Sequence, residues 1–164
     1  MLKKLSPVVL LIGACFFFLK ASPSPTACAF CNSDVLHAQT FYEDELILAL
    51  ITHRPIFPGH CLIIPKRHVE NFDALSENEI LQMSLGIKRV HERVKKVFET
   101  SSYLLVQKNG KEVGQSVPHV HFHYIPRKLE EDSLVYFAIK SVLAQIKGPL
   151  SPEEMEKIVE NLKY

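Results

Sequence analysis

The stretch from Ser76 to Val97 constrains the fold more than any other part of this chain. It starts with "SENE", which has the S-x-x-E form of a helix capping box. Large apolar residues then recur every three or four positions, at Ile80, Met83, Ile87, Val90, Val94 and Val97. This spacing predicts one long amphipathic helix, and its apolar face needs a second layer of structure to cover it.

The segments on both sides of this helix have the composition of β-strands. Residues 40–51 predict two short strands around an acidic turn, and "HCLIIP" (60–65) predicts a buried strand. After the helix, "YLLVQ" (103–107) and a histidine-containing segment predict two more strands, joined by a polar turn with the hairpin signal Asn109-Gly110. Two helices follow, at roughly 133–146 and 152–162. The predicted fold class is α+β, an antiparallel five-stranded sheet with the long helix packed on it and C-terminal helices.

The charge balance narrows the partners that this chain can bind. Its 164 residues contain 19 Lys and Arg and 18 Asp and Glu, for a formal net charge of +1. Such a balance argues against broad, non-specific binding to nucleic acid. The length that remains after an unusual N-terminus suits one domain.

Residues 1–27 form that unusual N-terminus. Lys3 and Lys4 precede an apolar run from Val8 to Leu19, and small and turn-forming residues follow. This order is typical of a secretory signal peptide, and the run is short for a membrane span, which needs about 20 residues. We expect a signal-like or membrane-anchoring leader, and we favour export or membrane attachment over a cytoplasmic location.

The segment "GQSVPHVHFHYIPR" (114–127) holds three histidines two positions apart. On a strand, His119, His121 and His123 share one face, and the apolar residues between them pack the other. Such a face can bind a metal or act on a phosphate. A purely structural role is disfavoured, because three imidazoles on one half-exposed face would lose hydration without burying much apolar surface. "GQS" upstream and Arg127 downstream supply the backbone access and polar donors that suit an anion, so nucleophilic chemistry on phosphorus is favoured.

Three segments together resemble the histidine triad (HIT) superfamily of nucleotide hydrolases and transferases. They are "YEDELILAL", "RPIFPGHCLIIPKRHVENF" and "QKNGKEVGQSVPHVHFHYIPRK". The resemblance implies a HIT domain over residues 28–128 and a C-terminal helical extension over 129–164. The central motifs are similar to the fragile-histidine-triad branch, which cleaves diadenosine polyphosphates. Members of the superfamily usually form dimers through the long helix and an edge strand, and a homodimer is expected here.

The resemblance also assigns roles to individual residues. It makes His121 the nucleophile that carries a nucleotidyl intermediate, and it places His123 at the phosphate or the departing group. His60 matches a histidine near the backbone carbonyl that supports the nucleophile. Further matches cover the first triad histidine and the substrate contacts: His119, Gln115, Ser116, Asn109 and Thr52. Thr52 departs from the Asn or Asp that binds the ribose in the family. The family's phosphate-binding Asn is replaced or shifted here, since Asn109 lies five residues before Gly114 and Lys108 lies six.

The pair in "CAFC", Cys28 and Cys31, has two possible meanings. A C-x-x-C pair suits a disulfide in an oxidising compartment and a metal site in the cytosol. In zinc-containing members of the superfamily this pair joins two histidines, here His68 and His119. The resemblance therefore implies a structural zinc site of two thiolates and two imidazoles.

The combined prediction is an enzyme that cleaves at the α-phosphorus of dinucleoside polyphosphates or related nucleotide conjugates, with no organic cofactor. One alternative is a nucleoside phosphoramidase, and another is a zinc-stabilised nucleotide-binding module with little turnover. By resemblance, an adenine-binding wall is expected at Ile51, Ile56 and Phe57. The remaining histidines, His37, His53 and His91, are expected on the surface.

Overall fold

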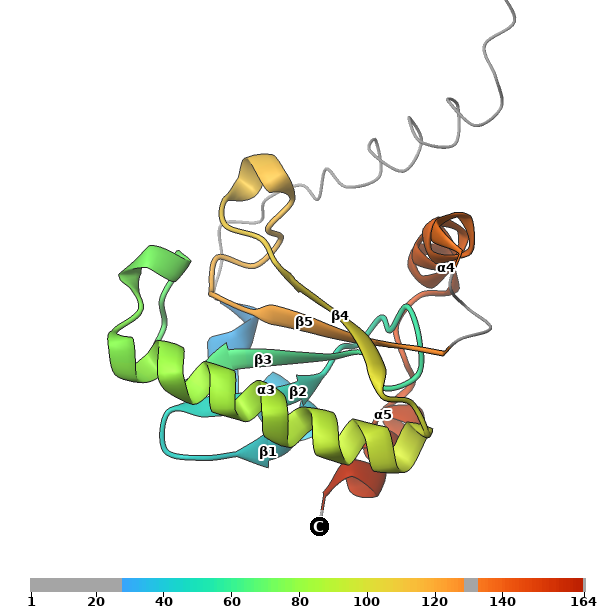
Figure 1. Ribbon diagram of the computed structural model, residues 1–164, viewed down its shortest axis with the longest axis horizontal. Helices are drawn as coiled ribbons and strands as arrows, with labels where there is room; N and C mark the ends of the chain where they lie inside the picture. The colour runs from blue at the N-terminus through green and yellow to red at the C-terminus, as the bar shows by residue number, and fades with distance from the viewer. Residues whose placement is uncertain (1–27, 129–132, 164) are drawn as a thin grey trace, which may run out of the picture.

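In the computed structural model, which describes residues 28–128 and 133–163, five antiparallel strands form one sheet (Figure 1). The strands are β1 (Thr40–Glu43), β2 (Ile47–Ile51), β3 (Cys61–Pro65), β4 (Ser102–Gln107) and β5 (Phe122–Arg127). Their order across the sheet is β1-β2-β3-β5-β4, so β5 is inserted between β3 and β4. The α+β class and the antiparallel five-stranded sheet are confirmed.

Helix α3 (Glu77–Phe98) packs across β2 and β3 on one face of the sheet. Ser76 and Glu79 form the predicted capping box at its start. Gly86 allows a close approach to the sheet, because a Cβ at this position would lie 2.0 Å from Cδ1 of Ile47. The predicted apolar stripe ends at Val94: Val97 is 37% exposed, and Phe98 packs against the core instead.

Shorter helices surround the sheet: η1 (Ala29–Cys31), α2 (Ser33–Gln39), η2 (Phe72–Ala74), η3 (Lys111–Val113), α4 (Leu134–Lys147) and α5 (Pro152–Leu162). The two C-terminal helices lie where the sequence predicts them. Met155, Val159 and Leu162 of α5 belong to the core beneath α3, so this helix is part of the main fold. The predicted leader over 1–27 lies outside the described residues.

The two faces of the sheet carry different sets of side chains, because neighbours along a strand point to opposite sides. Ala49, Ile63 and Tyr124 face α3. Leu50 and Leu62 face the other way and pack with Phe30 of η1. Since Leu62 pairs with His123 in the β3–β5 register, the histidine motif reaches the face opposite α3.

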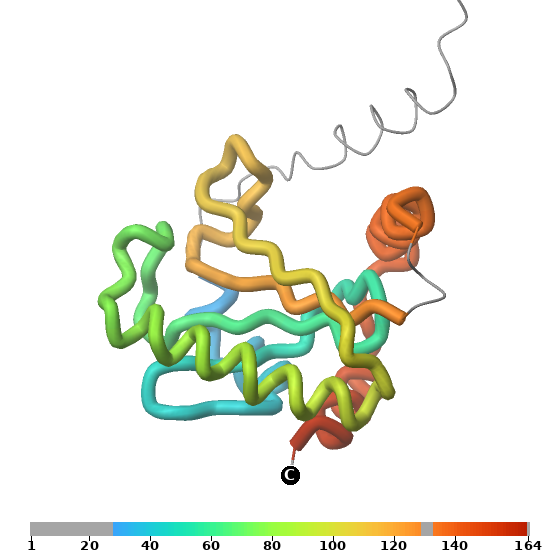
Figure 2. Tube along the Cα trace, viewed as in Figure 1, coloured from blue at the N-terminus to red at the C-terminus, as the bar shows by residue number. Residues whose placement is uncertain are grey.

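The connection between β4 and β5 is longer than a tight hairpin and runs from residue 108 to 121. Asn109 does not close a two-residue turn; its Oδ1 accepts a hydrogen bond from the backbone N–H of Phe72 at 2.8 Å. This bond joins the connection to the η2 loop, and Figure 2 shows both loops at the same end of the sheet. Among the described residues, no helix is long and apolar enough to cross a membrane.

Candidate functional site

The three histidines of the motif lie at the start of β5. The strand begins at Phe122, so His119 and His121 precede it and only His123 lies within it, which corrects the predicted strand start. The rings of His121 and His123 still share one side, with centroids 5.0 Å apart. Between them, Phe122 turns away to pack against Phe72, as alternation predicts.

His121 is held in one orientation by the backbone. Its Nδ1 lies 2.8 Å from the carbonyl oxygen of His119, and only a protonated Nδ1 can donate to that oxygen. The other nitrogen, Nε2, therefore keeps its lone pair while the ring is neutral. Burial is the main cause that lowers the pKa of His121 below its usual value, so the neutral form is favoured. A neutral, oriented imidazole with a free Nε2 is a nucleophile.

His123 is oriented by a second histidine. The backbone N–H of Ile56 donates to Nδ1 of His60 at 3.2 Å, which leaves the proton of a neutral His60 on Nε2. That Nε2 lies 3.0 Å from Nδ1 of His123 and donates to it, so His123 carries its own proton on Nε2. Burial lowers the pKa of both rings to about 3, which keeps them neutral. His123 thus presents an N–H donor beside His121, and the side chain of His60 contacts His123.

The predicted substrate residues have different surroundings. The Gln115 side chain is engaged by the backbone: its Oε1 accepts from Gly110 at 2.7 Å and its Nε2 donates to Glu70 at 2.9 Å. Ser116 is exposed, and Thr52 is buried beside His60, its N–H donating to the His60 carbonyl at 3.4 Å. Asn109 is exposed as well, but its side chain is bonded to the η2 loop.

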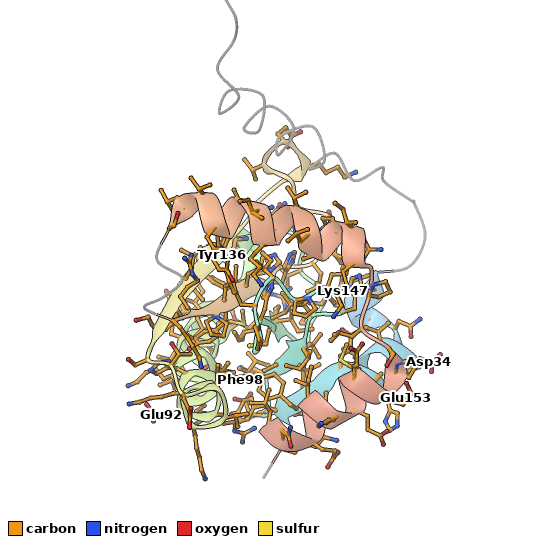
Figure 3. All side chains as sticks on the ribbon, turned by 90° about the vertical axis from the view of Figure 1, so that its right-hand side faces the viewer. Asp34, Glu92, Phe98, Tyr136, Lys147 and Glu153 are labelled. Atoms are coloured by element: carbon orange, nitrogen blue, oxygen red, sulfur yellow. The ribbon has the colours of Figure 1, made fainter. Side chains whose placement is uncertain are left out.

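One of the three residues expected to contact adenine, Ile51, lies on the wrong face of the sheet. Ile51 is buried in the core beneath α3, on the face away from the histidines, so it is not part of an adenine-binding wall. Phe57 instead packs against two aromatic rings of α4, Tyr136 and Phe137, at centroid distances of 6.0 and 6.1 Å. Figure 3 shows α4 lying across one end of the molecule, with Tyr136 labelled.

Cys28, Cys31, His68 and His119 come together as the resemblance implies. Their potential ligand atoms all lie within 4.8 Å of one another, and both cysteines are free thiols in this structure. Nδ1 of His119 lies 3.3 Å from Sγ of Cys28, and Nδ1 of His68 lies 3.4 Å from Sγ of Cys31. Two thiols and two imidazole nitrogens within this span suit a tetrahedral metal site.

His119 connects this cluster to His121. Its Nε2 donates to the carbonyl oxygen of Pro65 at 2.9 Å, which turns the lone pair of Nδ1 toward the thiols. Its own carbonyl oxygen accepts from His121. Phe30 packs edge-on against both rings, at centroid distances of 5.8 and 5.3 Å. The sequence pattern gave no signal for Phe30, because its role depends on a short helix that carries no periodicity.

The other histidines only partly match the surface prediction. His37 and His53 are exposed as expected. His91 is half-buried, and its Nδ1 lies 2.7 Å from the hydroxyl of Tyr124, on the α3 side of the sheet. It therefore has a structural partner and takes no part in the candidate site.

A family model, several relatives and a solved structure are all similar to this chain. The HIT domain family model matches residues 33–130. A HIT-like protein of Methanocaldococcus jannaschii is 37% identical over 129 residues, which are 74% of this chain and 99% of that protein. A bis(5'-adenosyl)-triphosphatase of Dictyostelium discoideum is 34% identical over 126 residues, or 75% and 82% of the two chains. The solved structure of Plasmodium falciparum diadenosine triphosphate hydrolase superposes with a TM-score of 0.65 at 20% identity, covering 94% of this chain and 92% of that one; it supports the fold.

Proposed function

This chain belongs to the HIT domain family, and from that premise we propose that it is a nucleotide hydrolase that attacks the α-phosphorus of dinucleoside polyphosphates through His121. The observation that carries this proposal is the single orientation of His121, whose Nδ1 is tied to the His119 carbonyl. Its Nε2 lone pair is free to form a bond to phosphorus. The name of the Dictyostelium relative, a bis(5'-adenosyl)-triphosphatase, supports the substrate class.

The proposed reaction has two displacements. First, Nε2 of His121 forms a bond to the α-phosphorus, and the bond from phosphorus to the bridging oxygen breaks with its electron pair going to the leaving group. Then a water oxygen forms a bond to the phosphorus, the bond from phosphorus to Nε2 breaks with its electron pair returning to Nε2, and a proton of the water passes to solvent. A nucleoside monophosphate and the free histidine result. Two easier steps replace one difficult step. The N–H at Nε2 of His123 can donate to an oxygen that gains charge in either step.

We further propose that the cluster of Cys28, Cys31, His68 and His119 holds a structural zinc ion. The donor set fits zinc, because thiolate and imidazole ligands in a closed tetrahedral site are typical of that metal. When bound, the metal would fix the first residues of the described chain against the sheet. Since His119 also holds His121, the same residues orient the nucleophile.

A homodimer is proposed through the edge strand β4 and α3. Three apolar side chains of β4 remain exposed in the monomer: Tyr103 at 42%, Leu104 at 41% and Leu105 at 38%. An unpaired apolar edge strand is normally covered, and pairing with a second copy would cover this one.

For the cellular location we propose export or membrane attachment through the leader over residues 1–27. The short basic start and the apolar run from Val8 to Leu19 support this. Fractionation of cells that express the full chain, compared with a form lacking residues 2–27, tests it. Equal recovery of both forms in the cytoplasmic fraction would contradict it.

The experiment that tests the activity is a substrate panel of diadenosine triphosphate, diadenosine tetraphosphate and adenosine phosphoramidate. We expect AMP release from the polyphosphates, and loss of that release in His121→Ala, which still binds nucleotide. A preference for the phosphoramidate would support the phosphoramidase alternative. Binding of nucleotide without any turnover by the wild type would support the binding module.

A further inference from the structure

Lys108 follows the last residue of β4 and lies beside the start of β5. In the ladder, Val106 pairs with His123 and Gln107 pairs with Phe122. The ladder ends at the pair of Gln107 and Phe122, so Lys108 and His121 are the residues directly beyond its end on the two strands. Because paired residues point to the same face and neighbours alternate, Lys108 lies on the side of the sheet that carries His121 and His123.

Among the residues that the structure describes, Lys108 has no carboxylate partner. The residue is half-buried. Its backbone carbonyl accepts a hydrogen bond from Nε2 of Gln107 at 2.9 Å, which fixes the main chain at this point. A lysine without an ion-pair partner in the protein can donate charged hydrogen bonds to an anionic group of a ligand.

The positive charge of Lys108 also lowers the pKa of His121 and His123. Burial is the largest cause that lowers the pKa of His123 to about 3, and the charge of Lys108 acts in the same direction, as protonation of His60 or His121 would. This agrees with the position that the strand register gives to the side chain.

We propose that Lys108 binds the phosphate next to the one that His121 attacks, and so selects substrates whose leaving group is itself a phosphate anion. The inference rests on the proposed function. When the bond between the α-phosphorus and the bridging oxygen breaks, its electron pair stays on the departing phosphate. An ammonium group beside that oxygen stabilises the added charge. An amine leaving group gains no such charge, and Lys108 gives it no corresponding advantage.

The test compares kcat/KM for diadenosine triphosphate and for adenosine 5′-phosphoramidate in the full-length protein. The variants are Lys108→Gln, the charge-conserving Lys108→Arg, and Lys111→Gln as a control, since Lys111 is an exposed lysine of η3 in the same loop. Lys108→Gln is expected to lower kcat/KM for the triphosphate on the order of 10-fold or more, the effect of one lost hydrogen bond to a charged group. The phosphoramidate value should change much less, and Lys108→Arg should largely restore the preference.

Calorimetric binding of AMP and ADP to wild type and Lys108→Gln separates this inference from the proposed activity. Wild type should bind ADP more tightly than AMP, and Lys108→Gln should reduce that ratio. Equal losses for both substrates, or an unchanged ratio of ADP to AMP affinity, would overturn the role of Lys108. A wild type that turns over no substrate would refute the proposed function, while the binding ratio would still decide the role of Lys108.

Discussion

Each histidine of the motif has one ring nitrogen held by a different group. Nε2 of His119 donates to Pro65, Nδ1 of His121 donates to the carbonyl of His119, and Nδ1 of His123 accepts from His60. The free nitrogen of each ring therefore has a different character. His119 offers a lone pair to the thiol cluster, His121 offers a lone pair for attack, and His123 offers an N–H donor.

The buried histidine His60 gives a prediction about pH. Burial lowers its pKa from 6.5 to about 3, so in acid the unfolded chain binds a proton that the native protein does not. Stability from this group is fully present above about pH 6.5 and is lost as the pH falls toward about 3. The variant His60→Gln removes the titrating ring and keeps an amide donor toward His123. Its free energy of unfolding should depend less on pH than that of wild type, measured by urea unfolding at about pH 7.5 and about pH 5.

His37→Gln is the matched control, because His37 is an exposed residue of α2. It should keep the pH dependence of the wild type. An unchanged pH dependence in His60→Gln would show that the buried ring does not titrate as inferred.

Individual site residues were predictable where the motif itself contains them. The spacing of His119, His121 and His123 indicates a shared face, and two of these rings lie as expected. The contact between His60 and His123 was not predictable, because it joins positions 63 residues apart through the conformation of the loop between β2 and β3. The position of Lys108 depends on the β4–β5 register, which a sequence alone does not specify.

At the scale of elements, the packing of α3 on the sheet gives a stability prediction. In Gly86→Ala the new methyl group would overlap Cδ1 of Ile47, which is fully buried. Overpacking of this kind costs about 1–3 kcal/mol of the free energy of unfolding. Urea unfolding measures it, and Lys88→Ala, at an exposed position of the same helix, should have little effect. Equal stability of Gly86→Ala and wild type would show that α3 can shift away from β2.

The cluster of Cys28, Cys31, His68 and His119 joins η1, the segment after β3 and the segment before β5. Loss of the proposed zinc ion should therefore destabilise all three segments. Purified wild type should contain about one zinc ion per chain by elemental analysis. His68→Ala should contain much less zinc and unfold at a lower temperature, because metal binding contributes to folding. His37→Ala should retain the metal.

A Cys28–Cys31 disulfide in the purified protein, detected by mass spectrometry, would contradict the metal assignment. So would a wild type that remains free of zinc after expression in zinc-supplemented medium.

Elements with strong local signals were predictable, and those without were not. The capping boxes at Ser76 and Ser151 mark the starts of α3 and α5, and both are present. Helix α2 has seven residues and a cap at Asn32, and no regular spacing of apolar residues predicts it. The start of β5 was placed too early, because alternation continues through His119 and His121 although the ladder begins only at Phe122.

In the whole molecule, the candidate site lies on one face of the sheet and most of the core lies on the other. Helix α5 completes that core although it lies beyond the residues that the family model matches. The division of the chain into a domain over 28–128 and an extension over 129–164 remains a prediction, but the packing of α5 joins the two parts.

The exposed edge strand gives a prediction about assembly. Leu104→Lys places a charge on β4, and it should shift the protein from dimer to monomer in sedimentation measurements. Leu134→Lys is the control, because Leu134 is 83% exposed on α4, outside the proposed interface. A monomeric wild type, or a dimer that persists in Leu104→Lys, would contradict the proposed interface.

The most direct test of the central claim is the mass of the protein after rapid quenching during turnover of diadenosine triphosphate. We predict a fraction of the chains with one added adenylyl group on the peptide that contains His121. The adduct should be acid-labile and absent from His121→Ala. Release of AMP with no adduct on any histidine, or an adduct that persists in His121→Ala, would contradict nucleophilic attack by His121.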